Sequence, residues 1–235
     1  MNLDSVRYFS DGSLWVLIAA YNEERVISNV IKDLLLNVTN NVLVVDDGSS
    51  DNTAKLAKAA GAHVISHCDN LGQGAALQTG FSYLKGIEFN YVVTFDADGQ
   101  HMYEDIRVMV NALEKERVDI ALGSRFLGRV ENISKKKLLT LKLAIAFTNA
   151  TSGVRLTDSH NGLRLLTARA VKEIFITQRG MAHASEIIDE IRNKNLKWCE
   201  VPVTIKYTEY SMSKGQRISN SISILLDLLI NRLYK

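Results

Sequence analysis

Short apolar runs alternate with amphipathic segments through the first half of the chain. The apolar runs are rich in β-branched and aromatic residues, which predicts buried strands at 15–20, 42–45, 63–66, 91–95 and 120–125. Between them, apolar residues recur at helical spacing, which predicts helices at 26–37, 53–60, 70–85 and 104–115. This alternation is typical of an α/β fold, here a Rossmann-like, mostly parallel sheet with helices on both faces.

Polar residues gather where the predicted strands end. The clusters are Tyr21-Asn22-Glu23, Asp46-Asp47, Asp96-Ala97-Asp98 and Ser124-Arg125. Parallel sheets bind ligands at the carboxyl ends of their strands, where the crossovers change direction. We therefore predict that the four clusters belong to one site.

The stretch 91–104 carries the strongest candidate chemistry. A predicted strand runs directly into Asp96 and Asp98, and Gly99 permits a turn that brings both carboxylates onto one hard cation. The local sequence is equally consistent with a solvated turn, because Asp and Gly are the commonest turn residues.

The charge of the 235-residue chain is +2, which gives no support for nucleic-acid binding. Basic residues nevertheless gather in the second half, and Lys135, Lys136 and Lys137 open a nearly apolar segment at 137–148. A helix of this kind is either buried or lies against lipid. An apolar stripe at 217–235 indicates packing within the core or in a homodimer, or contact with a membrane surface.

The cysteines and the N-terminal residues indicate a cytoplasmic protein. Cys68 and Cys199 have no ligand-like spacing and are expected to remain unpaired. The polar start of the chain does not resemble a signal peptide, and no apolar run reaches the ~20 residues of a spanning helix. We expect the protein to be peripheral at the inner face of the membrane.

Six motifs, taken in order, resemble those of the family 2 glycosyltransferases with the GT-A fold. They are Ala20-Tyr21-Asn22-Glu23, Val45-Asp46-Asp47-Gly48-Ser49-Ser50-Asp51, Asn70-Leu71-Gly72-Gln73-Gly74, Asp96-Ala97-Asp98-Gly99-Gln100-His101, Gly123-Ser124-Arg125 and Asp158-Ser159-His160-Asn161-Gly162-Leu163-Arg164. The resemblance is closest to the branch of dolichyl-phosphate mannose synthase and the bacterial polyprenyl-phosphate glycosyltransferases. Departures from the family pattern are Gln73 for a frequent Lys, Met102-Tyr103 for two prolines, and Leu163 for a usual Phe.

The resemblance implies a nucleotide-sugar donor and Mg²⁺ or Mn²⁺ as cofactor. The implied nucleotide-binding residues are Ala20, Tyr21, Glu23, Asp46, Asp47, Gln73 and Asp96, and the implied metal ligands are Asp96, Asp98 and Gln100. Arg125 would add a cation to the phosphates, and a structural ion pair is the less favoured interpretation of Arg125. His101 is expected to support the metal site rather than to act as a base.

In the resembled branch the acceptor is a polyprenyl phosphate, whose oxygen is already an anion near pH 7 and needs no strong base. Arg164, Lys214 and Arg125 are the candidates to bind it. A sugar-hydroxyl acceptor would need Asp158 or Glu186 to take its proton. The alternatives are a helix or turn cap for Asp158 and an exposed helix position for Glu186.

We therefore expect a metal-dependent, inverting glycosyltransferase, a hexosyltransferase of cell-surface glycan synthesis. It would move a sugar from a UDP- or GDP-linked donor to a polyprenyl-phosphate or lipid-linked acceptor. The catalytic candidates are Asp98, Arg125, Asp158 and Glu186. Transfer to a hydroxyl of a growing polysaccharide and a non-catalytic nucleotide-sugar-binding protein stay open as alternatives. The expected domains are a glycosyltransferase domain at 1–216 and an amphipathic helix at 217–235.

Overall fold

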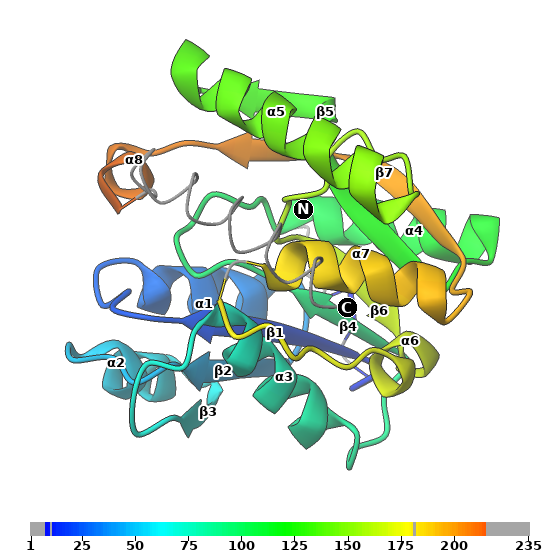
Figure 1. Cartoon of the computed structure of the whole chain (residues 1–235). Helices are drawn as coiled ribbons and strands as arrows, with labels where there is room; N and C mark the ends of the chain where they lie inside the picture. The colour runs from blue at the N-terminus through cyan, green and yellow to red at the C-terminus, as the bar shows by residue number, and fades with distance from the viewer. Residues whose placement is uncertain (1–7, 10, 181, 215–235) are drawn as a thin grey trace, which may run out of the picture.

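The computed structural model describes residues 8–9, 11–180 and 182–214 (Figure 1), so the helix predicted at 217–235 lies outside the described residues. The strands are β1 (Leu14–Ala20), β2 (Asn41–Asp46), β3 (His63–Ser66), β4 (Tyr91–Thr94), β5 (Ile120–Glu131), β6 (Arg164–Thr167) and β7 (Trp198–Lys206). The helices are α1 (Ile27–Asn37), α2 (Thr53–Ala59), α3 (Gln73–Leu84), α4 (Glu104–Glu116), α5 (Lys135–Ser152), α6 (Ala168–Glu173), α7 (His183–Asn193) and α8 (Glu209–Lys214).

The strands form one sheet in the order β3-β2-β1-β4-β6-β5-β7. Strands β1 to β4 pair in parallel, and β5 pairs in parallel with β7. The predicted mostly parallel sheet is confirmed. The strand β6 is antiparallel to both β4 and β5, which the sequence analysis did not anticipate.

Helices cover both faces of the sheet, as predicted (Figure 1). Alternate residues of β1 face opposite layers: Val16 and Ile18 pack in the cluster with α1, α2 and α4, whereas Trp15 and Leu17 pack in the cluster with α3, α6 and α7. This period of two follows from strand geometry. Because both faces are covered, the strands consist of continuous apolar runs.

The antiparallel direction of β6 brings its first residue, Arg164, to the edge where the parallel strands β1, β2 and β4 end. The carboxyl-terminal residues Ala20 and Asp46 of β1 and β2 lie at this edge, and Asp96 follows β4 there. The edge therefore collects the polar clusters of the first half of the chain together with one arginine from the second half.

The helix α5 is longer than the predicted 137–148 segment, and it contacts α7. Its residues Leu139 and Leu143 are 60% and 61% exposed, so α5 is not a buried helix. Among the described residues, no helix is long and apolar enough to cross a membrane. Of the two expectations for this segment, burial is wrong, and contact with lipid remains a prediction.

Gly80 on α3 lets that helix approach β1 closely. A Cβ at this position would lie 2.2 Å from a terminal carbon of the fully buried Leu17. We expect Gly80→Ala to lower the free energy of unfolding by about 1–3 kcal/mol through overpacking. Gly86→Ala is the matched control, because its Cβ would meet only ordinary contacts. Urea denaturation of both variants measures the difference, and equal stabilities would contradict the close approach.

Candidate active site

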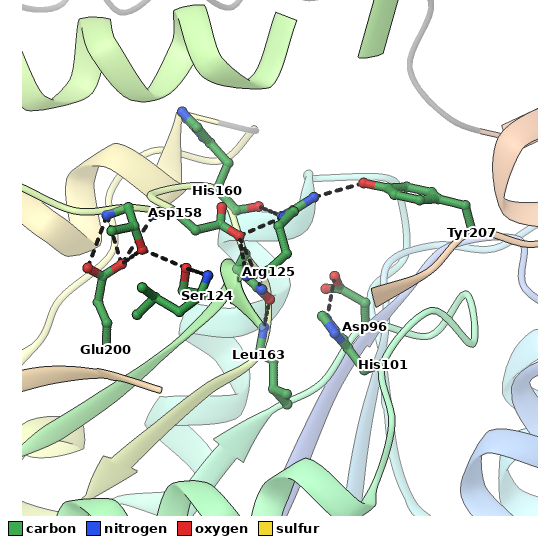
Figure 2. A network of polar contacts seen from close by, with 12 residues as sticks. Asp96, His101, Ser124, Arg125, Asp158, His160, Leu163, Glu200 and Tyr207 are labelled. Carbon is green, nitrogen blue, oxygen red and sulfur yellow. Dashed lines mark hydrogen bonds and ion pairs between the residues drawn. The ribbon is translucent and has the colours of Figure 1, made fainter. Parts of the chain in front are cut away.

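The carboxylates of Asp96 and Asp98 lie at the turn after β4, where Gly99 has the left-handed φ of 73° that the turn requires. Gln73 Nε2 donates to Asp96 Oδ1 at 3.3 Å, and His101 Nε2 lies 3.0 Å from Asp96 Oδ2 (Figure 2). Asp98 accepts hydrogen bonds from the backbone N–H of Gln100, at 3.1 Å, and from the Gln100 side chain. Neighbouring donors therefore hold both carboxylates in place, and His101 supports Asp96.

The two carboxylates influence each other's charge. Burial and the neighbouring Asp96 carboxylate raise the pKa of Asp98 to about 6. Burial also acts to raise the pKa of Asp96, but the opposing effect of His101 and Arg164 is larger and leaves that pKa lowered. The turn is thus a partly desolvated centre of negative charge.

The donor set fits a hard divalent cation. Carboxylate and amide oxygens of Asp96, Asp98 and Gln100 are the ligands that Mg²⁺ and Mn²⁺ prefer. In the part of the chain that the structure describes, no group of three or more His, Cys, Asp or Glu side chains is arranged to hold a metal ion. A cation at this turn would therefore take its remaining ligands from a bound diphosphate or from water.

The Asp47 carboxylate is hydrogen-bonded within the protein. Its Oδ1 lies 2.7 Å from His67 Nδ1 and accepts a hydrogen bond from the Leu71 N–H at 3.0 Å, while its Oδ2 accepts one from the Gly72 N–H at 2.7 Å. His67 Nε2 lies 2.9 Å from Thr79 Oγ1 on α3. Asp47 thereby fastens the turn before α3 to the sheet. The sequence analysis missed His67, since its partner precedes it by 20 positions.

Asp46 has an acceptor still available. It is buried, but its Oδ1 accepts no hydrogen bond from a described residue. A buried acceptor without a partner is costly, which is a common property of ligand-binding groups. Of the two aspartates predicted to bind the nucleotide, Asp46 is the one with free bonding capacity.

The residues after β1 form the rim of this edge. The Ala20 carbonyl accepts a hydrogen bond from the Asp47 N–H at 2.8 Å, and Tyr21 is half-exposed. Glu23 Oε2 accepts a hydrogen bond from the Tyr210 hydroxyl of α8 at 2.8 Å. Glu23 therefore joins the predicted nucleotide side of the site to α8, a contact that no sequence pattern indicated.

Arg125 lies in a buried polar network (Figure 2). Its Nε donates to Asp158 Oδ2 at 2.6 Å, its Nη1 to the Tyr207 hydroxyl at 2.8 Å, and its Nη2 to the His160 carbonyl at 3.1 Å. Burial acts to lower the pKa of Arg125, but the combined effect of Asp158 and Tyr207 is larger and raises it. The structural ion pair, which the sequence analysis disfavoured, is present, and Asp158 is the partner of Arg125 rather than a simple turn cap.

Two further cations lie at the site. Arg164 is only 3% exposed, yet no hydrogen bond or ion pair joins its guanidinium to a described residue. Lys137, at the start of α5, places its Nζ 4.2 Å from the centre of the Tyr207 ring, and burial and Arg125 lower its pKa. Lys137 was visible in the sequence only as part of a charge run. The side chain of Lys214 lies outside the described part of the chain.

Glu186 is buried on α7, so the exposed position considered for it is wrong. Its Oε2 accepts hydrogen bonds from the backbone N–H groups of Thr177, at 2.9 Å, and Gln178, at 2.8 Å. Its Oε1 accepts a hydrogen bond from the Thr177 hydroxyl. The carboxylate is therefore engaged by the loop that precedes α7.

The sequence model of "Glycosyl transferase family 2" matches residues 15–175. This chain is a family 2 glycosyltransferase. It is 35% identical over 225 residues to an uncharacterised protein of Methanocaldococcus jannaschii, covering 94% of this chain and 93% of that protein. It is 32% identical to the UDP-N-acetylglucosamine–dolichyl-phosphate N-acetylglucosaminyltransferase of Methanococcus voltae, covering 96% of this chain and 98% of the relative.

Solved structures agree with the predicted fold of this glycosyltransferase. The glucosyl-3-phosphoglycerate synthase of Mycobacterium tuberculosis, solved with Mn²⁺, UDP-glucose and phosphoglyceric acid, superposes with a TM-score of 0.70. The alignment covers 95% of this chain and 79% of that one at 18% identity. At this identity the likeness establishes the fold alone.

The different surroundings of Asp46 and Asp47 predict opposite effects on stability. We expect Asp47→Asn to lower the free energy of unfolding by roughly 1–3 kcal/mol, because an amide cannot accept hydrogen bonds at both positions. Asp46→Asn, the matched neighbour, is expected to leave stability unchanged or to raise it, since it removes the charge of a buried carboxylate whose Oδ1 accepts no hydrogen bond from a described residue. Urea denaturation of the two variants decides, and a larger loss for Asp46→Asn would contradict these assignments.

Proposed function

We propose that this glycosyltransferase moves a sugar from a UDP- or GDP-linked donor to a polyprenyl phosphate at a membrane surface. The acceptor assignment is carried by the state of the two candidate bases. Asp158 forms an ion pair with Arg125 through Oδ2, while its buried Oδ1 has no hydrogen-bond partner among the described residues, and Glu186 is engaged at both oxygens by Thr177 and Gln178. A sugar hydroxyl must lose a proton to a base, whereas a phosphate oxygen is already an anion. An ion-paired Asp158 and a fully hydrogen-bonded Glu186, beside the cations Lys137 and Arg164 that have no ion-pair partner among the described residues, suit a phosphate acceptor. The name of the Methanococcus voltae relative supports this choice.

On the donor side, Asp46 accepts hydrogen bonds from the base or ribose of the nucleotide, and Ala20, Tyr21 and Glu23 line the same pocket. Asp47 acts through the turn before α3, which it holds in place. Gln73 and Asp96 face the diphosphate from α3 and from the end of β4. The unpaired Oδ1 of Asp46 supports its direct role.

Asp96, Asp98 and Gln100 would hold Mg²⁺ or Mn²⁺. When bound, the ion would supply positive charge to offset the charge that builds on the departing nucleoside diphosphate. An acceptor phosphate oxygen forms a bond to the anomeric carbon as the bond from that carbon to the diphosphate breaks, with inversion. Arg125, Lys137 and Arg164 hold the acceptor phosphate, and Lys214 is retained as a candidate for the same task.

The exposed side chains of α5 support the proposal that this site works next to a lipid surface. Exposed Leu139 and Leu143 share the helix with exposed Lys135, Lys136 and Lys142, and Lys137 on the same helix points its charge toward Arg125 and Tyr207. Apolar and basic side chains on one exposed helix favour an anionic membrane surface such as the cytoplasmic leaflet. We therefore propose peripheral attachment there, with residues 217–235 as a predicted second contact with lipid or with another subunit.

Removing one carboxylate tests the metal and donor assignment. We expect Asp98→Asn to lower transfer of sugar from UDP-N-acetylglucosamine or another nucleotide sugar into polyprenyl phosphate at least about 100-fold in Mn²⁺, because the leaving diphosphate loses several kcal/mol of stabilisation. Asp33→Asn, at an exposed position of α1, is the control. Radiolabel recovered in a lipid extract measures the product. Full activity of Asp98→Asn would remove the metal role.

Charge on α5 tests the membrane contact. We expect the double variant Leu139→Glu with Leu143→Glu to bind vesicles of anionic phospholipid at least about tenfold more weakly, because carboxylates are repelled and hydrated there. Nucleotide binding should be unchanged. Leu36→Glu on α1 is the matched control, since Leu36 is 55% exposed but lies on another helix. Equal vesicle co-sedimentation of the variant and the wild type would refute the assignment of α5.

A further inference from the structure

The loop at 176–180 connects α6 to α7 and is held from the α7 side by Glu186. Among the described residues, three hydrogen bonds reach the Glu186 carboxylate, and they come from Thr177 and Gln178. Both backbone N–H groups go to Oε2, and the Thr177 hydroxyl goes to Oε1. The carboxylate is buried, so it replaces water as the partner of these loop groups.

The other side of this loop packs directly on the first turn of α3. The Arg179 carbonyl accepts hydrogen bonds from the N–H groups of Gly74, at 2.8 Å, and Ala75, at 3.4 Å. The Ile176 N–H donates to Gln78 Oε1 at 2.7 Å. A Cβ at Gly74 would lie 1.9 Å from the Gln178 carbonyl oxygen, so only glycine permits this contact.

The first turn of α3 also carries Gln73, whose side chain reaches Asp96 Oδ1. A continuous series of contacts therefore runs from Glu186 through the loop and the start of α3 to the carboxylate of Asp96. Hydrogen bonds connect each step of this series, and the close approach of Gly74 to the Gln178 carbonyl leaves little room for the loop to move relative to α3. A displacement of the loop would change the position of Gln73 relative to Asp96.

We propose that Glu186 is a positioning residue for the donor site and not a general base. It holds the loop at 176–180 on α3 and thereby fixes Gln73 beside Asp96, where the nucleotide diphosphate binds. This inference rests on the proposed function, in which a phosphate acceptor needs no base.

The geometry allows glutamine to replace Glu186 in this task. A glutamine carbonyl at the place of Oε2 accepts both backbone N–H groups, and its amide at the place of Oε1 donates to the Thr177 hydroxyl, which can accept. Glutamine cannot take up a proton as a base at neutral pH. Glu186→Gln therefore separates positioning from base catalysis, whereas Glu186→Ala removes both.

The experiment compares wild type, Glu186→Gln, Glu186→Ala and Gly74→Ala, with Glu190→Gln on the same helix as the control. Binding of UDP and of GDP in Mn²⁺ is measured by calorimetry, and kcat and KM for the nucleotide sugar are measured in the lipid-product assay. We expect Glu186→Ala and Gly74→Ala to weaken nucleotide binding and raise KM on the order of tenfold, with a smaller effect on kcat. Glu186→Gln should stay within about twofold of wild type in both.

Loss of turnover in Glu186→Gln with unchanged nucleotide binding would show a base and overturn the proposal. Wild-type nucleotide binding in both Glu186→Ala and Gly74→Ala would overturn it as well. If Glu186→Ala does not fold, Glu186→Gln still tests for a base, and Gly74→Ala still tests whether the loop contact affects nucleotide binding. A wild-type protein that binds nucleotide but transfers no sugar to polyprenyl phosphate refutes the acceptor assignment alone, because the binding comparison still tests the loop. A wild type that binds neither nucleotide overturns both.

Discussion

Two neighbouring carboxylates removed from water, Asp96 and Asp98, impose the main constraint on this molecule. Placing like charges together in a partly buried site costs free energy, which appears here as the raised pKa of Asp98. His101 and Gln73 contact Asp96 directly, and Arg164 acts on it through its charge. These neighbours come from separate elements, so the carboxyl edge of the sheet is organised around this pair. A divalent ion bound together with a diphosphate would offset this concentration of negative charge.

A second electrostatic feature, the buried Arg125–Asp158 ion pair, lies on the proposed acceptor side of the site. Glu200 on β7 accepts hydrogen bonds from Thr157 and from the Asp158 N–H, which sets the loop that carries Asp158 (Figure 2). Tyr207, just after β7, binds the same guanidinium. Removing either member would leave a buried charge unpaired, which is far costlier than losing an exposed pair. The ion pair thus holds the Arg125 guanidinium at a defined position. The positive charges of Lys137 and Arg164 stay available, since neither residue has an ion-pair partner among the described residues.

The buried carboxylates of this enzyme fall into two groups, those that hold loops in place and those that are proposed to bind ligands. Asp47 and Glu186 each receive three hydrogen bonds and hold loops, one before α3 and one before α7. Both loops meet at the first turn of α3, next to Gln73. Asp46 keeps an unpaired buried oxygen, and Asp96 and Asp98 carry the concentrated negative charge. Acidic residues that look alike in the sequence therefore have separate tasks, and their hydrogen-bond partners distinguish them.

The sequence by itself determined the α/β fold, the positions of the first five strands and the edge at which the site lies, because these depend on local periodicity and on where polar residues interrupt it. It also determined the Asp96–Asp98 turn, since Gly99 and the strand before it are contiguous with the carboxylates. Only the tertiary structure decided that β6 runs antiparallel and brings Arg164 to the site, that His67 belongs to Asp47, and that Arg125 pairs with Asp158. The same holds for the engagement of Glu186 and for the exposure of α5. These depend on pairings between residues far apart in the chain, which local pattern cannot specify because many partners of suitable charge are available.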